Sequence, residues 1–360
     1  MSYPVRSIVA LGLTLFFLCA SCQPKEVTPL RKEHPTEPAV LPRDLAAHPW
    51  AQTEWWYYTG HLKDADGRDY GFELTFFRFR PDPEMVKSPL SKGVIGYMAH
   101  LAVVEEDAAR YRNDMLAGIE GRLAGASPDR YRVFIGDWSV EGDEQSQHLK
   151  AKNREIGLDL MVAPDKPYVL HGRSGIVEKG NGLANYYFSN PRMKANGTLK
   201  LDGREFKVSG MAWFDHEYGY MGVTPTTGWD WFSLQLDDNT EYMFYRIRRH
   251  ENGYEPESRA CRIDAAGAEE CVPISEIGME VLSRWRSPKT GGVYPASWHI
   301  KIPQFGFDAI IVPTVPEQEF NHGLAYWEGS CRVVGQPANG RAFVELVGYA
   351  RNNFHGSRKK

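Results

Sequence analysis

Short stretches of alternating apolar and polar residues dominate the chain from about residue 53 onward. The stretch Tyr70–Arg80 repeats with a period of two, which is typical of a β-strand because successive side chains point to opposite faces. Asp64-Ala-Asp-Gly67 precedes it and predicts a hairpin turn. Helical periods are scarce, and Ile274–Ser283 is compatible with either a strand pair or a short helix. Many short strands separated by turns predict an all-β fold of barrels or sandwiches.

The two halves of the chain carry a faint internal repeat. In the copy at residues 55–80, two tryptophans precede an acidic turn and then an aromatic strand that ends in arginines. The copy at 229–246 has the same order. The repeat predicts two related β-domains, although the shared preference of aromatic residues for strands would produce the same pattern by coincidence.

The N-terminus is typical of an export signal. The apolar run Ile8–Leu18 is too short to span a bilayer, and the following residues up to Cys22 resemble a bacterial lipobox. We expect residues 1–22 to be a lipoprotein signal with Cys22 lipidated, or alternatively an ordinary cleaved secretory signal. Gln23 favours a lipid anchor in the outer membrane, on the periplasmic face of the cell envelope.

Residues 23–47 are rich in proline and have few large apolar side chains before Leu41. This composition predicts a semi-extended tether. The folded halves are then expected at 48–222 and 223–352.

Composition and cysteine spacing narrow the functional classes. The net charge of −4 gives no basic patch for nucleic acid. The 10 Trp, 18 Tyr and 17 Phe suit β-structure and ligand cavities, or simply fill the core. Cys261 and Cys271 flank a predicted hairpin turn at 265–268, so a disulfide between them is plausible in an oxidising compartment. Cys331 is then expected to be a buried free thiol.

The stretch Trp213-Phe-Asp-His-Glu-Tyr218 is the densest cluster of reactive side chains. On an extended strand, Asp215 and Glu217 share one face about 7 Å apart, whereas His216 and Tyr218 point to the other. A carboxylate among tryptophans has a raised pKa and can donate a proton near neutral pH. Alternatively, both acids pair with arginines such as those at 78, 80 and 246 and join the domains.

Motifs for other chemistries are missing from the sequence. There is no Gly-X-Ser-X-Gly elbow, phosphate-binding loop, His-Glu-X-X-His motif or zinc-type cysteine pairing. We therefore expect neither a metal nor a cofactor.

Four stretches resemble the family of carotenoid 1,2-hydratase (hydroxyneurosporene synthase) and AttH-like proteins: His48–Tyr57, Ala212–Gly219, Gly228–Leu236, and Tyr326–Gly329 together with Gly340–Tyr349. The resemblance implies two lipocalin-like antiparallel β-barrels in tandem. It also implies a hydrophobic small molecule, a lipid or an isoprenoid, as the ligand. Many members have been called predicted secreted hydrolases, but no nucleophilic constellation in this sequence matches that label.

A carotenoid hydratase adds water across a C=C bond, which requires a proton donor and aromatic faces that stabilise the cation. The resemblance points to catalytic candidates Asp215, His216, Glu217 and Tyr218. The expected ligand-binding residues are Trp55, Trp56, Trp213, Trp229, Asp230, Trp231 and Tyr245, with Asp230 as a further possible donor. Two functions stay open, a periplasmic carrier of an apolar ligand and a hydro-lyase acting on one.

Overall fold

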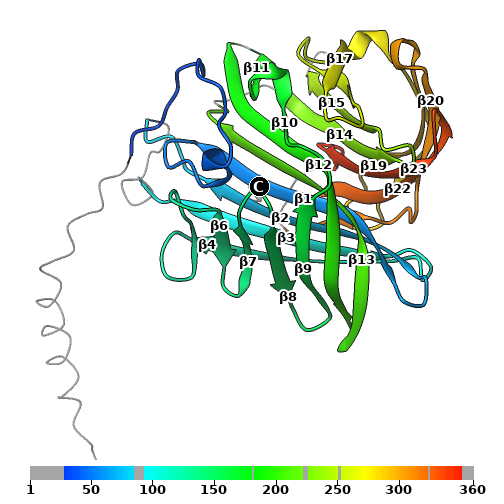
Figure 1. Ribbon diagram of the computed structural model, residues 1–360, viewed down its shortest axis with the longest axis horizontal. Coiled ribbons are helices and arrows are strands. Elements are labelled where there is room, and N and C mark those ends of the chain that lie inside the picture. Colours follow the sequence, from blue (N-terminus) through cyan, green and yellow to red (C-terminus); the bar gives the residue numbers. More distant parts are fainter. Residues whose placement is uncertain are drawn as a thin grey trace, which may run out of the picture.

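The computed structural model describes residues 28–84, 93–180, 182–221, 226–249, 253–322 and 325–350. The expected signal at 1–22, with Cys22, lies outside the described residues. Figure 1 shows two strongly curved antiparallel sheets side by side, the first coloured blue to green and the second yellow to red. Within the described residues, no helix has the length and apolarity needed to cross a bilayer.

The first sheet has the strand order β4-β3-β2-β1-β13-β12-β9-β8-β7-β6-β5, and β10 and β11 pair with β12. Because β4 also contacts β5 and β6, the sheet curls back toward closure. Its strands are β1 (Thr53–Asp64), β2 (Asp69–Phe79), β3 (Gly96–Glu105), β4 (Arg110–Ile119), β5 (Ala124–Ala126), β6 (Arg132–Ile135), β7 (Trp138–Gly142), β8 (Gln147–Lys152), β9 (Ile156–Pro164), β10 (Val169–Leu170), β11 (Ile176–Gly180), β12 (Leu183–Leu201) and β13 (Arg204–Gly219).

The second sheet has the order β17-β16-β15-β14-β23-β22-β20-β19-β18, and β21 pairs with β22. Its strands are β14 (Thr226–Leu236), β15 (Glu241–Arg249), β16 (Arg259–Ile263), β17 (Glu269–Pro273), β18 (Gly278–Arg286), β19 (Val293–Ile302), β20 (Phe307–Pro313), β21 (Glu319–Phe320), β22 (Tyr326–Gln336) and β23 (Gly340–Val347). Short 3₁₀ turns are η1 (Arg43–Leu45), η3 (His171–Arg173), η4 (Ile274–Glu276) and η5 (Pro303–Phe305).

The two sheets repeat one topology. In each, the first strand lies between its hairpin partner and the last strand of the sheet, so β1 is flanked by β2 and β13, and β14 by β15 and β23. This arrangement confirms the predicted all-β fold of two tandem lipocalin-like barrels. It also gives the faint sequence repeat a structural basis.

Several local predictions can be compared with the strands. The hairpin turn before Gly67 is confirmed between β1 and β2, and Gly67 adopts the left-handed conformation (φ 84°). The ambiguous segment Ile274–Ser283 forms η4 followed by β18. The turn that joins β12 to β13 contains Asp202 and Gly203, both at positive φ.

The packing of residues 28–47 corrects the prediction that this segment is a tether. Ala39, Leu45 and Ala47 are buried against the first sheet, and the indole Nε1 of Trp56 donates to the Leu45 carbonyl at 3.1 Å. The small apolar side chains between the prolines therefore pack onto the barrel. The described part of this segment belongs to the folded unit.

Three apolar clusters account for the core. One fills the first barrel around Trp56, Tyr58 and Phe214, and another fills the second around Phe232 and Trp298. The third lies between the sheets, where β1, β2 and β12 contact β14, β22 and β23. This third cluster positions the candidate site.

The three cysteines among the described residues agree with the prediction. Cys261 and Cys271 are register partners on β16 and β17 and form a disulfide. Cys331 is free and buried, and burial raises the pKa of its thiol well above the usual range. A thiol of this kind is a poor nucleophile at neutral pH.

Candidate active site between the two sheets

Strand β13 divides the predicted catalytic residues between two faces. Trp213, Asp215 and Glu217 face the second sheet, whereas His216 and Tyr218 face the core of the first barrel. The expected alternation is therefore confirmed. It also corrects the grouping of four catalytic residues, because a β-strand separates one pair from the other.

Asp215 lies in the interface, only 3% exposed. Its carboxylate accepts hydrogen bonds from Trp213 Nε1 at 2.6 Å, from the Tyr187 hydroxyl at 2.7 Å and from the Ser189 hydroxyl. Burial raises the pKa of Asp215 to about 6, although these donors oppose the shift. Its described hydrogen-bond partners are hydroxyl and indole groups, which corrects the expectation that an arginine would pair with it.

Glu217 is also buried on this face, but its partners come from the first sheet. The Nδ2 group of Asn185 donates to Glu217 Oε1 at 2.8 Å, and Lys179 Nζ lies 2.8 Å from the same oxygen. The alternative of an arginine partner is again not what the structure shows, because a lysine and an amide take that place. Glu217 is thus already neutralised by a cation, which makes it a weaker candidate for proton transfer than Asp215.

The second sheet places two further acids opposite Asp215. Glu328 on β22 and Glu345 on β23 are register partners. Glu328 accepts a hydrogen bond from the Tyr57 hydroxyl at 2.7 Å, and the partly buried Glu345 accepts one from Trp229 Nε1 at 2.8 Å. Burial raises the pKa of Glu345 to about 7 and that of Glu328 well above its usual range.

Glu73 on β2 completes a cluster of four interface carboxyl groups with raised pKa values. Burial, followed by repulsion from Glu345, raises the pKa of Glu73 to about 8. Among the described residues, Glu73 Oε2 and Glu328 Oε2 are buried without a hydrogen-bond partner. Buried polar atoms without a partner call for an explanation such as a bound water, an ion or a catalytic role. Two of them fall within this cluster, which makes it a candidate site.

Aromatic rings surround these carboxyl groups. Trp231 packs edge-on against Tyr57 at 5.2 Å and against Trp213 at 6.0 Å, measured between ring centroids. Trp229 is 36% exposed at the edge of the interface, and Trp55 and Tyr245 pack at the margin of the same cluster. Five of the predicted ligand-binding residues therefore lie together, namely Trp55, Trp213, Trp229, Trp231 and Tyr245.

Two predicted ligand-binding residues lie elsewhere. Trp56 points into the first barrel, where it stacks on His216 at 4.9 Å. Asp230 is fully buried on the opposite face of β14 from Trp231, and it accepts hydrogen bonds from Arg246 and Arg248. Period-two alternation explains both corrections, since each residue is the direct neighbour of a tryptophan that does face the interface.

The sequence prediction missed Glu73, Glu328, Glu345, Tyr187, Ser189 and His171. Two of these residues could have been selected from the sequence, because Glu328 and Glu345 belong to stretches that carry the family resemblance. An acidic residue in the middle of an otherwise apolar strand was the available signal. Their pairing across β22 and β23 is a tertiary feature.

A separate buried group in the first barrel has the chemistry of a metal site. His48, Glu54 and His216 place their donor atoms within 4.8 Å of one another. Glu54 Oε1 lies 2.8 Å from His48 Nδ1 and 3.1 Å from His216 Nε2. These contacts also satisfy the carboxylate as ordinary hydrogen bonds, so the arrangement does not require an ion.

Ion pairs hold the two sheets together around the site. Lys166 and Arg192, both from the first half, contact the buried carboxylate of Glu241 on β15. Arg341 Nη2 on β23 lies 2.7 Å from Glu106 Oε1. These ion pairs lie outside the carboxyl cluster, where the hydrogen bond from Tyr57 to Glu328 also joins the two sheets.

Comparisons with known proteins agree with this architecture. A family model described as AttH-like matches residues 32–349. A crystal structure assigned to AttH from Nitrosomonas europaea is 27% identical with a TM-score of 0.79, over 90% of this chain and 100% of that one. Kievitone hydratase from Nectria haematococca is 16% identical with a TM-score of 0.68, over 89% and 98% of the two chains, which shows a shared fold. Among curated proteins, none matches.

Proposed function

Because the chain belongs to the AttH-like family, we propose that it binds an apolar, isoprenoid-like alkene between its two sheets and adds water to a C=C bond. The reaction class is that of a hydro-lyase, as in carotenoid 1,2-hydratases. The structural relative kievitone hydratase is named for the same class of reaction. The observation that carries the proposal is the cluster of buried carboxyl groups with raised pKa values between aromatic walls.

Glu345 is the proton donor in this proposal. Its pKa of about 7 keeps a substantial protonated fraction at neutral pH, which suits a general acid. It is partly buried and hydrogen-bonded to Trp229 at the accessible edge of the interface. The π electrons of the alkene take its proton at the less substituted carbon, and a tertiary cation forms.

The aromatic rings and Asp215 complete the reaction. The faces of Trp229 and Trp231 stabilise the cation through their π electrons. With a pKa of about 6, Asp215 is largely ionised at neutral pH and removes one proton from the attacking water as the C–O bond forms. The product is a tertiary alcohol, and Glu345 regains its proton from solvent.

A carrier function is the second candidate. The orphaned oxygens of Glu73 and Glu328 would be satisfied by the polar head group of a bound lipid, without any turnover. Both candidates include export as a lipoprotein anchored through Cys22 on the periplasmic face of the outer membrane. The disulfide between Cys261 and Cys271 supports an oxidising compartment.

Farnesol and squalene in H₂¹⁸O provide the test, with mass spectrometry detecting ¹⁸O in a tertiary alcohol. We expect Glu345→Gln and Asp215→Asn each to lower kcat by about 10²–10⁴-fold, the usual contribution of general acid–base catalysis. The control is Glu270→Gln, an exposed residue on β17.

Binding is followed separately by quenching of tryptophan fluorescence. If both polyenes bind but yield no labelled alcohol, the hydro-lyase is refuted and the carrier is supported. If neither polyene binds or reacts, both functions are refuted for isoprenoid ligands.

A further inference from the structure

We propose that Ser189, His171 and Glu269 form a proton relay that connects Asp215 with solvent across the interface between the two sheets. The inference rests on the proposed role of Asp215 as the base. A base buried at 3% exposure must lose the proton that it takes from water before the next turnover. The relay carries this proton from Asp215 to solvent.

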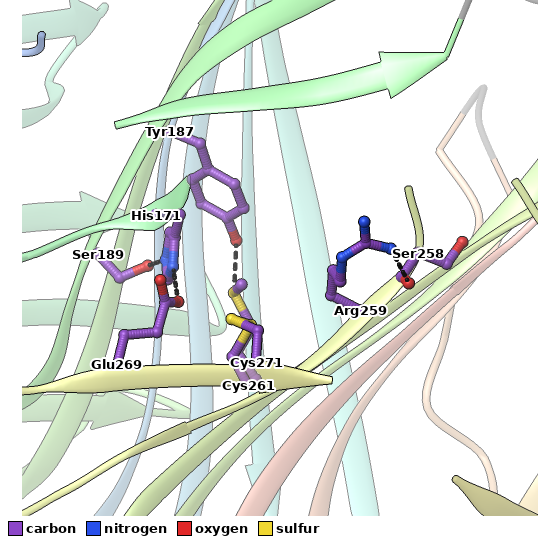
Figure 2. The surroundings of a disulfide bond; sticks show 9 residues. His171, Tyr187, Ser189, Ser258, Arg259, Cys261, Glu269 and Cys271 are labelled. Carbon is purple, nitrogen blue, oxygen red and sulfur yellow. Dashed lines mark hydrogen bonds and ion pairs between the residues drawn. A yellow bond between two sulfur atoms is a disulfide. The ribbon is translucent and has the colours of Figure 1, made fainter. Parts of the chain in front are cut away.

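The four groups form one continuous chain of hydrogen bonds. The Ser189 hydroxyl donates to Asp215 Oδ1. Ser189 Oγ lies 2.6 Å from His171 Nε2, and His171 Nδ1 lies 2.6 Å from Glu269 Oε1 (Figure 2). These short separations between groups that can each carry a proton are what a relay requires.

From Ser189 outward, burial decreases along the chain. Ser189 is 0% and His171 2% exposed, whereas the Glu269 side chain is 12% exposed. Glu269 comes from β17 of the second sheet, while His171 and Ser189 come from η3 and β12 of the first half. The disulfide at Cys271, two residues after Glu269, ties β17 to β16 and so fixes the end of the chain that reaches solvent.

Proton movement along the chain balances at every step. Protonated Asp215 gives its proton to Ser189 Oγ while the former hydroxyl proton moves to His171 Nε2. The proton on His171 Nδ1 moves to Glu269, which releases it to water. Asp215 is then a carboxylate that accepts a hydrogen bond from the Ser189 hydroxyl, which is the arrangement in the structure. His171 is left with its proton on Nε2, and a turn of the imidazole ring brings that N–H back toward Glu269 before the next turnover.

Ser189, His171 and Glu269 also have the connectivity of a serine hydrolase triad. The position of Asp215 argues against that role. Its carboxylate is hydrogen-bonded to the Ser189 hydroxyl and would repel the negative oxygen that forms when a serine attacks an acyl group. A fully buried serine hydroxyl also lacks access to an acyl substrate.

Other polar groups face the relay and affect its pH dependence. The Tyr187 ring lies 4.6 Å from the His171 ring, and its hydroxyl donates to Asp215. The Nζ atom of Lys179 lies 5.4 Å from the centroid of the same Tyr187 ring. Asp215 and Glu217 both contribute to the raised pKa of Glu345, so the charge of Asp215 is also coupled to that group.

The first arm of the test measures turnover of farnesol. We expect His171→Ala to lower kcat at least about tenfold with KM unchanged, and dissolved imidazole to restore the rate in proportion to its concentration. Glu269→Gln should lower kcat in the same way, whereas Glu270→Gln on the same strand should not. A purely structural role for His171 predicts no rescue by imidazole, and wild-type turnover in His171→Ala overturns the relay.

The second arm needs no substrate and therefore separates failure of the relay from failure of the proposed function. In protein labelled with ¹⁵N-histidine, the ring nitrogens of His171 should report the titration of Asp215 near pH 6. This response should vanish in Asp215→Asn and weaken in Ser189→Ala. His171 signals that are identical in wild type and Asp215→Asn, or labelling of Ser189 by a fluorophosphonate, would overturn the relay.

Discussion

Replacement of Asp215 by asparagine tests whether burial of this carboxyl group destabilises the folded chain. Asparagine has nearly the same shape, and its carbonyl oxygen still accepts the hydrogen bonds of Ser189 and Trp213. The Tyr187 hydroxyl, which also lies 3.2 Å from Met243 Sδ, can turn to accept from the new amide. The substitution therefore removes an ionisation and little else.

The expected magnitude follows from the pKa. Burial raises the pKa of Asp215 from 3.8 to about 6 in the folded chain, and each unit corresponds to about 1.4 kcal/mol. The unfolded chain loses this proton at lower pH, so ionisation favours unfolding, and stability falls as pH rises from about 4 to about 6. Above that range the full cost of about 3 kcal/mol remains.

Urea unfolding, followed by tryptophan fluorescence at several pH values, measures the effect. We expect Asp215→Asn and wild type to have similar free energies of unfolding near pH 4, and the variant to be about 3 kcal/mol more stable near pH 7. The exposed Asp202→Asn is the control and should show no such trend. A stability difference that stays constant from pH 4 to pH 7 would refute the reasoning.

Three further predictions concern the scaffold. Glu241→Ala leaves its two cationic partners buried and should destabilise the chain by about 3–5 kcal/mol; unchanged urea unfolding would contradict this. Gly60→Ala should cost about 1–3 kcal/mol in the same assay, because the new Cβ would lie 2.4 Å from the Met211 carbonyl oxygen, and wild-type stability would show that the strands can move apart. The double substitution Cys261→Ser and Cys271→Ser should lower the free energy of unfolding by about 2–4 kcal/mol. Calorimetry should show a lower Tm for this variant than for oxidised wild type, and a Tm similar to that of wild type whose disulfide has been reduced.

The disulfide prediction also bears on the relay. Because Glu269 shares β17 with Cys271, loosening this strand should weaken the contact between Glu269 and His171. The ¹⁵N signals of His171 in the double serine variant provide the measurement. Signals that match those of Glu270→Gln would show that the strand holds its position without the disulfide.

The sequence by itself determined features that depend on neighbours along the chain. Alternation of side chains placed Asp215 and Glu217 on one face of β13 and His216 and Tyr218 on the other. The turn before Gly67 and the spacing of Cys261 and Cys271 follow from the geometry of hairpins, which a few adjacent residues define. Repeated short strands and the family resemblance were enough for two tandem β-barrels.

Only the tertiary structure decided which faces meet. Asp215 and Glu345 are distant in sequence and share a site because β13 and β23 lie on facing surfaces of different sheets, and the raised pKa values result from burial that no local pattern records. Residues 28–47 read as a tether because each small apolar side chain is insignificant alone, yet together they pack on the barrel. Local pattern sets where a side chain points, and long-range packing decides what it meets there.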